Sequence, residues 1–493
     1  MALFITKSNN ITNFNTTYHV LLKTELNKTF SIYGNLKKQI SHFAETQSFE
    51  GNYNESLVFN DIDNEKSSSK KFIGLGVKKE LNNEKIFRCA SSITYSIVSS
   101  KQKISSLQIV LPDSFDNIKV EKFLMGLFYG HYYFDKYKSK KSNLNDIDIS
   151  IISNNLSSST FTKILEKSKN VIEGVNMTRL LVNEQPEILT PAELAKYASK
   201  ISKRKNVTCE IFNEKELKKM NMLGIWNVGK GSANMPRFIH LKYKSGSKNK
   251  KIKKIALIGK GMTYDSGGLS LKPADYMVTM KMDMAGAGCV VGVFEALSLL
   301  QPKNLEVHGL IPSAENMPGP NAYRPDDVVV GLSGKSIEVI NTDAEGRVIL
   351  SDAIEYANRL KVSEMIDLAT LTGACMVALG NYTAGLFSNT VKQADKILKS
   401  SQNAGEKIWE LPLDEDLRSS IESNIADIKN SASTRYGGAI TAAMFLQHFV
   451  DKSIPWSHID IAGPAYIDSK RTWLAPGATG FGVMTLLDYL GAI

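Results

Sequence analysis

The chain has 493 residues, of which 43% are hydrophobic and 22% are charged. This length predicts two or three domains, and the composition excludes collagen-like, intrinsically disordered and disulfide-scaffold proteins. Lysine and arginine number 60 against 50 aspartate and glutamate; the first 170 residues hold 23 basic and 16 acidic groups, so most of the net charge of +10 lies there. This excess is compatible with an anionic partner such as nucleic acid, although a solvated charged face is its commoner meaning.

The N-terminal segment does not resemble a targeting signal. Met1–Asn10 has no basic region at its start, and Lys7 interrupts its apolar run. The longest nearly apolar stretch, Cys289–Leu300, contains Glu295 and is too short to span a bilayer. The four cysteines are far apart and form no Cys-x-x-Cys pair, which excludes a cysteine-rich zinc module and fits a reducing compartment. We therefore expect a soluble cytoplasmic protein with no membrane partner.

The first third of the chain mixes short β-rich runs with helical periodicity. We expect strands at Tyr18–Leu22, Thr94–Val98 and Leu107–Leu111, and a helix at Val120–His131. Together with polar breaks between them, these elements predict an α/β domain over residues 1–165.

Residues 166–205 are expected to form a helical linker. Thr190 stands where a helix N-cap is needed, Pro191 suits the first helical position, and apolar residues continue at helical spacing toward Arg204.

Beyond the linker, buried strands alternate with helices. Strands are expected at Lys254–Ile258, Glu306–Ile311, Glu364–Leu371 and Trp456–Ile461, with helices at Lys281–Leu300 and Glu345–Leu360. This alternation predicts an α/β/α domain over residues 206–493, with a mostly parallel sheet covered by helices on both faces. In such domains the chemistry collects at the carboxyl ends of the strands.

Two motifs point to other enzyme classes and fail on closer inspection. Gly224–Lys230 matches the start of a phosphate-binding loop, but Gly231 stands where a magnesium-binding Ser or Thr is needed, so a glycine-rich turn between strands is the better interpretation. Ser266 and Ser333 do not match the Gly-x-Ser-x-Gly pattern of serine hydrolases. The His-Glu-x-x-His pattern of zincins does not occur either.

The strongest chemical signal is a set of acids that lie at turns beside small residues. Asp265 follows the strand Lys254–Ile258, and Asp283 lies in the segment where the next helix begins. Asp343 and Glu345 alternate just before another helix, so their side chains point the same way, and the helix N-terminus favours negative charge there.

Each acid alone could be an N-cap or a turn former, but convergence of all four needs another explanation. Four carboxylates without cations would raise one another's pKa values, whereas two divalent ions would balance their charge. Oxygen ligands suit Mn²⁺, Mg²⁺ or Zn²⁺. Lys260, Lys272 and Arg347 lie beside the acids and are expected to polarise a substrate or bind an anion. The pattern by itself is compatible with a two-metal hydrolase.

Four motifs follow one another along the second half of the chain. They are Lys260-Gly-Met-Thr-Tyr-Asp-Ser-Gly-Gly268, Met280-Lys-Met-Asp-Met284, Asn341-Thr-Asp-Ala-Glu-Gly-Arg347 and Trp456-Ser-His-Ile-Asp-Ile-Ala-Gly463. This series, and the third motif above all, resembles the leucine aminopeptidase (cytosol aminopeptidase) family of di-metal peptidases. The resemblance covers roughly residues 176–493.

The resemblance implies a role for each matching residue. Two divalent ions, Mn²⁺ or Zn²⁺ with Mg²⁺ or Co²⁺ as alternatives, would bind to Lys260, Asp265, Asp283, Asp343 and Glu345. Asp265 and Glu345 would bridge the ions. Lys272 would hydrogen-bond the scissile carbonyl and its gem-diolate, and Arg347 would hold a bicarbonate that relays the proton from the metal-bridged water.

The resemblance also implies an activity and an architecture. The enzyme would hydrolyse N-terminal residues, preferably Leu and other apolar ones, from peptides by means of a bridging water activated by two metals. An apolar specificity pocket would be lined by Met280, Thr370, Leu371, Gly373, Ala462 and Ala465. The resemblance further implies an N-terminal domain similar to a macro domain and a zinc-peptidase-like catalytic domain. It also implies that the protein forms a homohexamer.

Two alternatives belong to other functional classes. Some bacterial members of the family double as DNA-binding regulators, so the basic N-terminal third could bind DNA, although a charge of +7 over 170 residues is weak support. A catalytically inactive scaffold is the other alternative, and the presence of every expected ligand type speaks against it.

Overall fold

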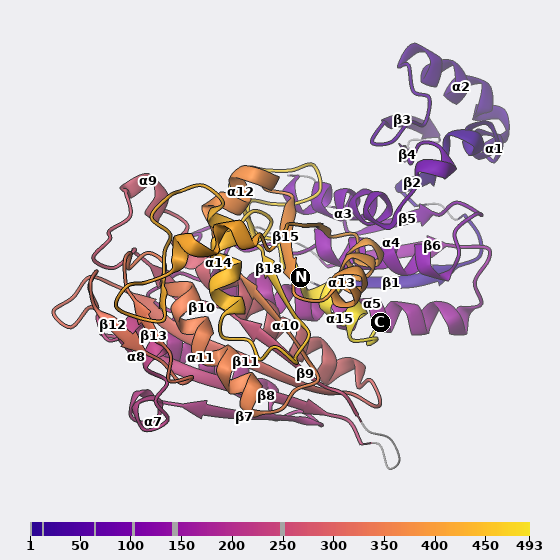
Figure 1. Cartoon of the computed structure of the whole chain (residues 1–493). Helices are drawn as coiled ribbons and strands as arrows, with labels where there is room; N and C mark the ends of the chain where they lie inside the picture. The colour runs from indigo at the N-terminus through magenta and orange to yellow at the C-terminus, as the bar shows by residue number, and fades with distance from the viewer. Residues whose placement is uncertain (1, 12–13, 64–65, 101–103, 141–145, 247–251) are drawn as a thin grey trace. The chain divides into compact units, whose positions relative to one another are not determined.

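The computed structural model describes residues 2–493 apart from 12–13, 64–65, 101–103, 141–145 and 247–251. The chain divides into two compact units: an N-terminal unit, Met1–Ile172 with Lys470–Ala475, and a second unit, Glu173–Ser469 with Pro476–Ile493 (Figure 1). The division falls within helix α5 (Ser158–Asn183). The limits expected from the sequence, a domain over 1–165, a linker over 166–205 and a domain over 206–493, stay a prediction.

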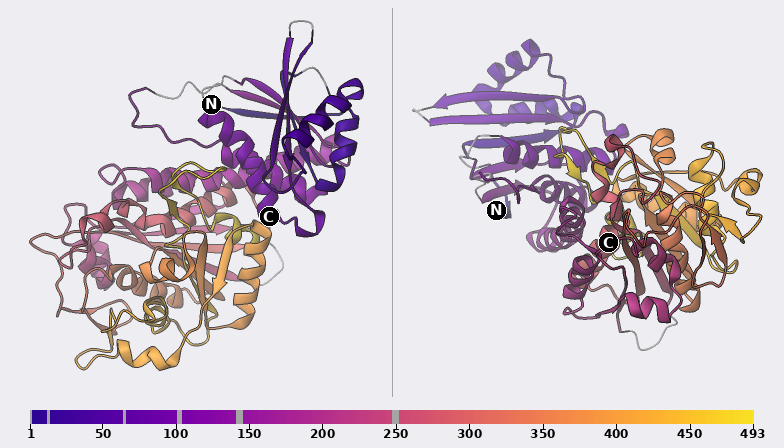
Figure 2. Two further views of the ribbon diagram at one scale, coloured as in Figure 1. Left: turned by 90° about the horizontal axis from the view of Figure 1, so that it is seen from above. Right: turned by 90° about the vertical axis from the view of Figure 1, so that its left-hand side faces the viewer.

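Within the described part of the N-terminal unit, the largest sheet is mostly parallel. Its strands lie in the order β1 (Leu3–Ser8), β6 (Ile147–Ile152), β5 (Ser106–Val110), β2 (Thr16–Leu21), β4 (Lys66–Gly74) and β3 (Ser56–Asp63). The neighbours pair in parallel except β3 and β4, which form a long antiparallel hairpin (Figure 2). Alternate residues of β5 and β6, such as Leu107 and Ile149, are buried in the core of the unit.

One strand expected in this unit is wrong. The segment Thr94–Val98 forms the last turns of helix α3 (Asn83–Ser99) rather than a strand. The other α-helices that lie wholly in this unit are α1 (Leu26–Ser31), α2 (Lys37–Thr46) and α4 (Asn117–Gly130). The β-branched residues of Thr94–Val98 favour a strand locally, but α3 starts at an Asn82 cap, which accepts from the Lys85 N–H, and buries Ile86, Cys89, Ile93 and Ile97 along one face. Burial of that helical face outweighs the local propensity.

A mixed sheet forms the centre of the second unit. Its strands lie in the order β16 (Lys407–Glu410), β15 (Thr383–Ser388), β18 (Trp456–Asp460), β14 (Glu364–Ala369), β9 (Lys254–Gly259), β11 (Glu306–Asn316), β8 (Arg237–Lys244) and β7 (Val207–Phe212), and β10 (Gly261–Asp265) also pairs with β11. The central strands β18, β14, β9 and β11 are parallel, as expected from the sequence.

Helices cover both faces of this sheet. Ala256 and Ile258 of β9 belong to one buried cluster with residues of α8 (Leu223–Gly229), α11 (Glu345–Arg359) and α14 (Gly438–Gln447). On the opposite face, a side chain at Gly309 would meet Val290 and Phe294 of α10 (Ala285–Leu300). The remaining helices are α6 (Pro191–Ile201), α7 (Glu214–Lys219), α9 (Ala274–Met277), α12 (Gly373–Leu379), α13 (Val391–Ala404) and α15 (Val483–Tyr489).

Local signals in the sequence were accurate at one helix of the second unit and wrong at another. Helix α6 begins at Pro191, and the Thr190 hydroxyl accepts from the Glu193 N–H, as the N-cap pattern predicted. Gly224–Lys230, expected as a turn between strands, instead covers most of helix α8. A side chain at Gly224 would meet Val348 and Asp352 of α11, so this glycine allows the two helices to pack closely.

The break between strands β9 and β10 positions Lys260, one of the residues expected at the functional site. Strand β9 ends at Gly259 and β10 starts at Gly261, and both run along β11. At the break, the Lys260 N–H donates to the Leu368 carbonyl, and the Lys260 carbonyl accepts from the Ala287 N–H at the start of α10. Lys260 is therefore held by its backbone at the carboxyl edge of the sheet, where several helix N-termini meet.

One helical stretch among the described residues, Ala274–Leu300, has the length and composition to cross a membrane. Its most apolar window is 89% buried inside the second unit. Such burial is typical of a core helix, which passes the same length and composition test.

Candidate metal centre and substrate pocket

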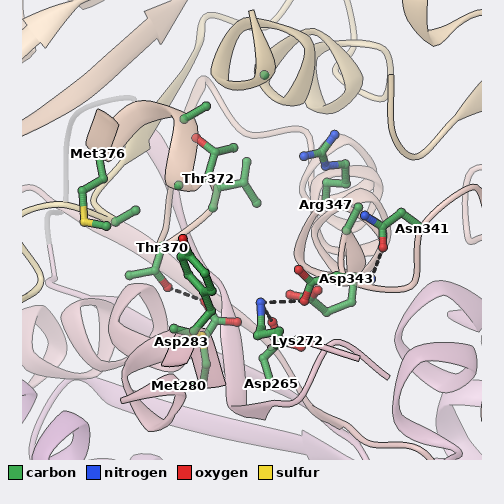
Figure 3. Close-up of a pocket in the computed structure, with 18 of the residues that line it drawn as sticks. Asp265, Lys272, Met280, Asp283, Asn341, Asp343, Arg347, Thr370, Thr372 and Met376 are labelled. Atoms are coloured by element: carbon green, nitrogen blue, oxygen red, sulfur yellow. Dashed lines mark hydrogen bonds and ion pairs between the residues drawn. The ribbon is translucent and has the colours of Figure 1, made fainter. Parts of the chain in front are cut away.

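A cavity of about 430 Å³ lies at the carboxyl edge of the central sheet (Figure 3). Its lining includes every residue expected at the metal site, at the catalytic positions and in the specificity pocket except Ala465. Ala465 is buried, and its N–H donates to the Ile461 carbonyl. The structure therefore brings together residues from β10, the start of α11, the segment after β14 and the segment after β18.

The Lys260 side chain lies between two carboxylates. Its Nζ is 2.7 Å from Asp283 Oδ2 and 2.9 Å from Glu345 Oε1, and it donates to the Thr370 carbonyl at 3.2 Å. The Thr370 hydroxyl donates to Asp283 Oδ1 at 2.7 Å. Asp283 lies in the short 3-10 helix η4 (Met280–Met284), directly before α10, so both acids sit at helix N-termini that favour negative charge.

Lys272 connects the other two acids. Its Nζ is 2.9 Å from Asp265 Oδ2 and 2.5 Å from Asp343 Oδ1, so it lies between them in Figure 3. Asp265 Oδ1 accepts from the Gly267 N–H at 2.9 Å and from Asn316 Nδ2 at 2.8 Å. These bonds fix the orientation of the Asp265 carboxylate.

Burial and mutual repulsion raise the pKa values of Asp283, Asp343 and Glu345. The pKa of Asp343 rises to about 7 because of burial, with Asp265 and Glu345 adding to the rise. Burial likewise raises the pKa of Asp283 well above its ordinary value and raises that of Glu345. For Lys260, burial alone would lower the pKa, but Asp283, Glu345 and Asp265 together hold it above its ordinary value.

These charges fit divalent cations. One oxygen from each of Asp265, Asp283 and Glu345 can be chosen so that all lie within 4.8 Å of one another. Glu345 Oε2 is buried and has no hydrogen-bond partner among the described residues. Four carboxylates share only two ammonium groups here, and hard oxygen ligands of this kind suit Mn²⁺, Mg²⁺ or Zn²⁺. A lysine nitrogen can join them only after it loses its proton.

Metal binding at this site is expected to strengthen as the pH rises. In the folded, metal-free protein Asp343 keeps its proton up to about pH 7, whereas in the unfolded chain it loses the proton near pH 3.8. The contribution of Asp343 to the free energy of unfolding of the metal-free protein therefore falls as the pH rises between those values. A carboxylate binds a metal ion only after it has lost its proton, so metal binding by Asp343, as the family resemblance implies, would require loss of that proton. The rise in Tm produced by Mn²⁺, measured against a chelator control, should therefore grow from pH 5.5 to pH 7.5. A metal-dependent shift in Tm that is constant over this range would contradict the prediction.

Gly346 makes room for Lys260. A Cβ at Gly346, in the first turn of α11, would lie 2.4 Å from Lys260 Cε and 2.6 Å from its Nζ. Because Lys260 is buried and bonded on several sides, its side chain cannot simply move away.

Replacing Gly346 by alanine is expected to lower kcat about ten- to hundredfold by displacing the lysine, since misoriented ligand surroundings weaken metal sites by that amount. Turnover and bound metal per subunit measure the effect, and circular dichroism checks that the variant is folded. Wild-type turnover with a full metal complement would rule out this role.

Arg347 is suited to an anion. Its Nη1 donates to the Asn430 carbonyl at 2.9 Å, and its buried Nε has no hydrogen-bond partner in the described part of the chain. Burial lowers the pKa of Arg347 to about 10, so the group stays charged at neutral pH. A buried guanidinium with a free N–H is an acceptable partner for a small oxyanion.

Part of the cavity lining is apolar. Its walls include Met280, Met282, Leu371, Met376 and Ala462. A cavity lined by both charged groups and apolar side chains can hold the polar end and the side chain of one amino acid.

Sequence reasoning did not select several residues that line or brace the cavity. Asn341 lines it, and its Oδ1 accepts from the Asp343 N–H at 2.8 Å. Asn316 donates a hydrogen bond to Asp265. Thr372 is the N-cap of α12, Met376 lies within that helix, and both line the cavity. Two of them lie in motifs that resemble the family: Asn341 opens the third motif, and Thr372 belongs to the segment Asp367–Ala374, which also resembles that family. Asn316 and Met376 belong to no such motif.

Comparisons with known proteins identify the family. A family model described as the catalytic domain of the cytosol aminopeptidase family matches residues 176–487, and the N-terminal domain model of the same family matches residues 22–141. A probable cytosol aminopeptidase of Aquifex aeolicus (strain VF5) is 46% identical over 421 residues, which cover 85% of this chain and 83% of the relative. The chain belongs to the cytosol aminopeptidase family.

Solved structures agree with this membership. A tomato leucine aminopeptidase mutant superposes with a TM-score of 0.88 at 31% identity, covering 99% of this chain and 96% of that one. The bottromycin maturation enzyme BotP in complex with Mn superposes with a TM-score of 0.83 at 30% identity, covering 97% and 98%. The expected family and two-domain α/β fold class are thus confirmed, and the chain is a metallo-aminopeptidase, a hydrolase that removes N-terminal residues from peptides.

Proposed function

We propose that this aminopeptidase prefers peptides that begin with Leu or another large apolar residue such as Met or Phe. The observation that supports this preference is the apolar part of the cavity lining, which includes Met280, Leu371, Met376 and Ala462. Burial of an apolar side chain there is favourable, whereas a charged side chain would lose its hydration without gaining a partner.

Two divalent ions, Mn²⁺ or Zn²⁺, are proposed to bind at the charged part of the cavity. Their ligands would be Lys260, Asp265, Asp283, Asp343 and Glu345, with Asp265 and Glu345 shared between the ions. When bound, such ions would hold the free α-amine, polarise the peptide carbonyl and lower the pKa of the attacking water. The need for a free α-amine restricts cleavage to N-terminal residues.

Residues of the chain itself complete the proposed mechanism. Lys272 would donate a hydrogen bond to the carbonyl oxygen, and this bond would strengthen as negative charge develops on that oxygen. Thr370 and Asn341 would hold Asp283 and the Asp343 segment in place, since their side-chain bonds are 2.7 and 2.8 Å long. Arg347 would bind a bicarbonate ion that serves as the proton relay.

A cytoplasmic location is proposed because the relatives are named cytosol aminopeptidases. A homohexamer is proposed only on the resemblance to the leucine aminopeptidase family. DNA binding by the basic N-terminal residues stays a prediction. A mobility shift with duplex DNA at two salt concentrations tests it, and no shift at low salt would end it.

Hydrolysis of aminoacyl chromogenic amides tests the proposed activity. We expect leucyl amide to be cleaved at least about tenfold more efficiently than the glutamyl and lysyl amides, since the pocket offers a charged side chain no partner. A chelator should stop cleavage, and Mn²⁺ or Zn²⁺ should restore it. N-acetylated leucyl amide is the control. Its rapid cleavage would contradict the requirement for a free amine, and equal cleavage of all the amides would contradict the apolar preference.

A further inference from the structure

Asp460 is a buried acid that does not itself line the cavity. It forms hydrogen bonds with residues of two segments that do line it. It is the last residue of β18 and has no solvent exposure. Its Oδ1 accepts from the backbone N–H groups of Leu371 and Ala462, both at 3.1 Å. Its Oδ2 accepts from the Thr372 hydroxyl at 2.7 Å. Leu371, Thr372 and Ala462 all line the cavity, so one carboxylate joins the segments that follow β14 and β18.

The bonds of Asp460 extend to helix α12. The Thr372 oxygen that faces Asp460 also accepts from the Cys375 N–H at 3.0 Å, as the N-cap of α12. Met376 of this helix forms part of the apolar wall. The start of α12 is therefore connected to the Asp460 carboxylate through the Thr372 hydroxyl.

The same segment is bonded to charged groups of the cavity lining one residue earlier. Thr370 donates its hydroxyl to Asp283 and accepts from Lys260 Nζ through its carbonyl. Residues 370–372 are thus held by Asp283 and Lys260 at one end and by Asp460 at the other. The three-residue segment therefore connects the charged groups Asp283 and Lys260 with Asp460.

We propose that Asp460 is a positioning residue for substrate selectivity: it holds the Leu371–Thr372 and Ala462 walls at the spacing that accepts a large apolar side chain. The proposal rests on the proposed function, since it takes the apolar part of the cavity as the site of the N-terminal side chain. Asp460 does not itself line the cavity, so its effect on the substrate acts through these walls.

A carboxylate suits this task better than an amide. Asp460 accepts from three donors, which are the N–H groups of Leu371 and Ala462 and the Thr372 hydroxyl. The side-chain oxygen of an asparagine could accept from the two N–H groups, but its Nδ2, which is a donor, would then face the donor hydroxyl of Thr372. The Thr372 hydroxyl would lose its acceptor, and a buried donor without a partner is unfavourable. Asp460→Asn should therefore loosen the Thr372 contact while it keeps the shape of the side chain.

The test compares leucyl and alanyl amides in the full-length, metal-loaded enzyme. For Asp460→Asn we expect the ratio of kcat/KM for leucyl over alanyl amide to fall about tenfold, with the metal content per subunit at the wild-type value. Asp352→Asn is the matched control, because Asp352 is equally buried and accepts from the backbone N–H groups of Ile225 and Leu332, but it does not line or brace the cavity. Its ratio should match that of the wild type, even if its Tm falls.

A second pair of variants keeps the proposal testable if Asp460→Asn does not fold. Thr372→Val removes the hydroxyl that Asp460 binds, and Thr372→Ser keeps it, so the valine variant should lose more selectivity than the serine variant. A folded Asp460→Asn enzyme with the wild-type ratio would overturn the proposal, and so would equal ratios in the two Thr372 variants. If the wild-type enzyme cleaved leucyl and alanyl amides equally, the proposed apolar preference would itself be contradicted. If the wild-type enzyme prefers leucyl amide and the Asp460→Asn variant keeps that preference, only the role of Asp460 is contradicted.

Discussion

Replacing Glu345 by glutamine is expected to lower kcat by at least about a thousandfold and to reduce the metal bound per subunit. Glu345 lies in the first turn of α11, is almost fully buried and contacts Lys260 at 2.9 Å. Its Oε2 has no partner in the described structure, so it is free to accept a cation. The amide keeps the size of the side chain but removes the negative charge that Glu345 would supply as a proposed shared ligand. Turnover of leucyl amide during an Mn²⁺ titration, together with metal analysis, measures both effects.

Glu355→Gln is the matched control for this change. Glu355 lies on the same helix, but it pairs with Arg359 at 2.9 Å and does not line the cavity. Its variant should keep wild-type turnover and metal content. If Glu345→Gln retained more than a tenth of wild-type turnover with a full metal complement, Glu345 would be removed from the proposed ligands.

Replacing Lys272 by methionine is expected to lower kcat by about a hundred- to a thousandfold with little change in KM. The reason is that Lys272 would stabilise charge that develops on the substrate only in the transition state. Without the ammonium group, Asp265 and Asp343 lose their shared ion-pair partner, whose Nζ lies 2.9 and 2.5 Å from them. Metal affinity should therefore be equal to or higher than that of the wild type. Steady-state kinetics and an Mn²⁺ binding titration separate the two effects.

Lys230→Met is the control for this variant. Lys230 Nζ donates to Asn227 Oδ1 at 2.6 Å, and Lys230 belongs to the segment that resembles the start of a phosphate-binding loop. Its variant should have wild-type kcat and KM. Loss of metal from Lys272→Met, or a change confined to KM, would contradict the role proposed for Lys272.

Short-range signals accounted for much of the secondary structure. The Thr190-Pro191 pair correctly predicted where α6 begins, and the apolar runs at Lys254–Ile258 and Trp456–Ile461 correspond to β9 and β18. The same reasoning failed at Thr94–Val98, where local β propensity gave way to the buried face of α3. Local propensity is a small free energy, and the packing of a whole helix exceeds it.

The sequence by itself determined the family and the mostly parallel sheet, because the motif Asn341–Arg347 is specific to the family and buried strands that alternate with helices are typical of such a sheet. The same motifs supplied the residue types at the site. Only the tertiary structure decided which charges meet. Lys260 lies between Asp283 and Glu345 because the break between β9 and β10 places it against the N-termini of α10 and α11, which are distant in sequence. The link from Asp460 to Leu371 and Thr372 crosses 88 or more positions of the chain, and no local pattern encodes a hydrogen bond of that span.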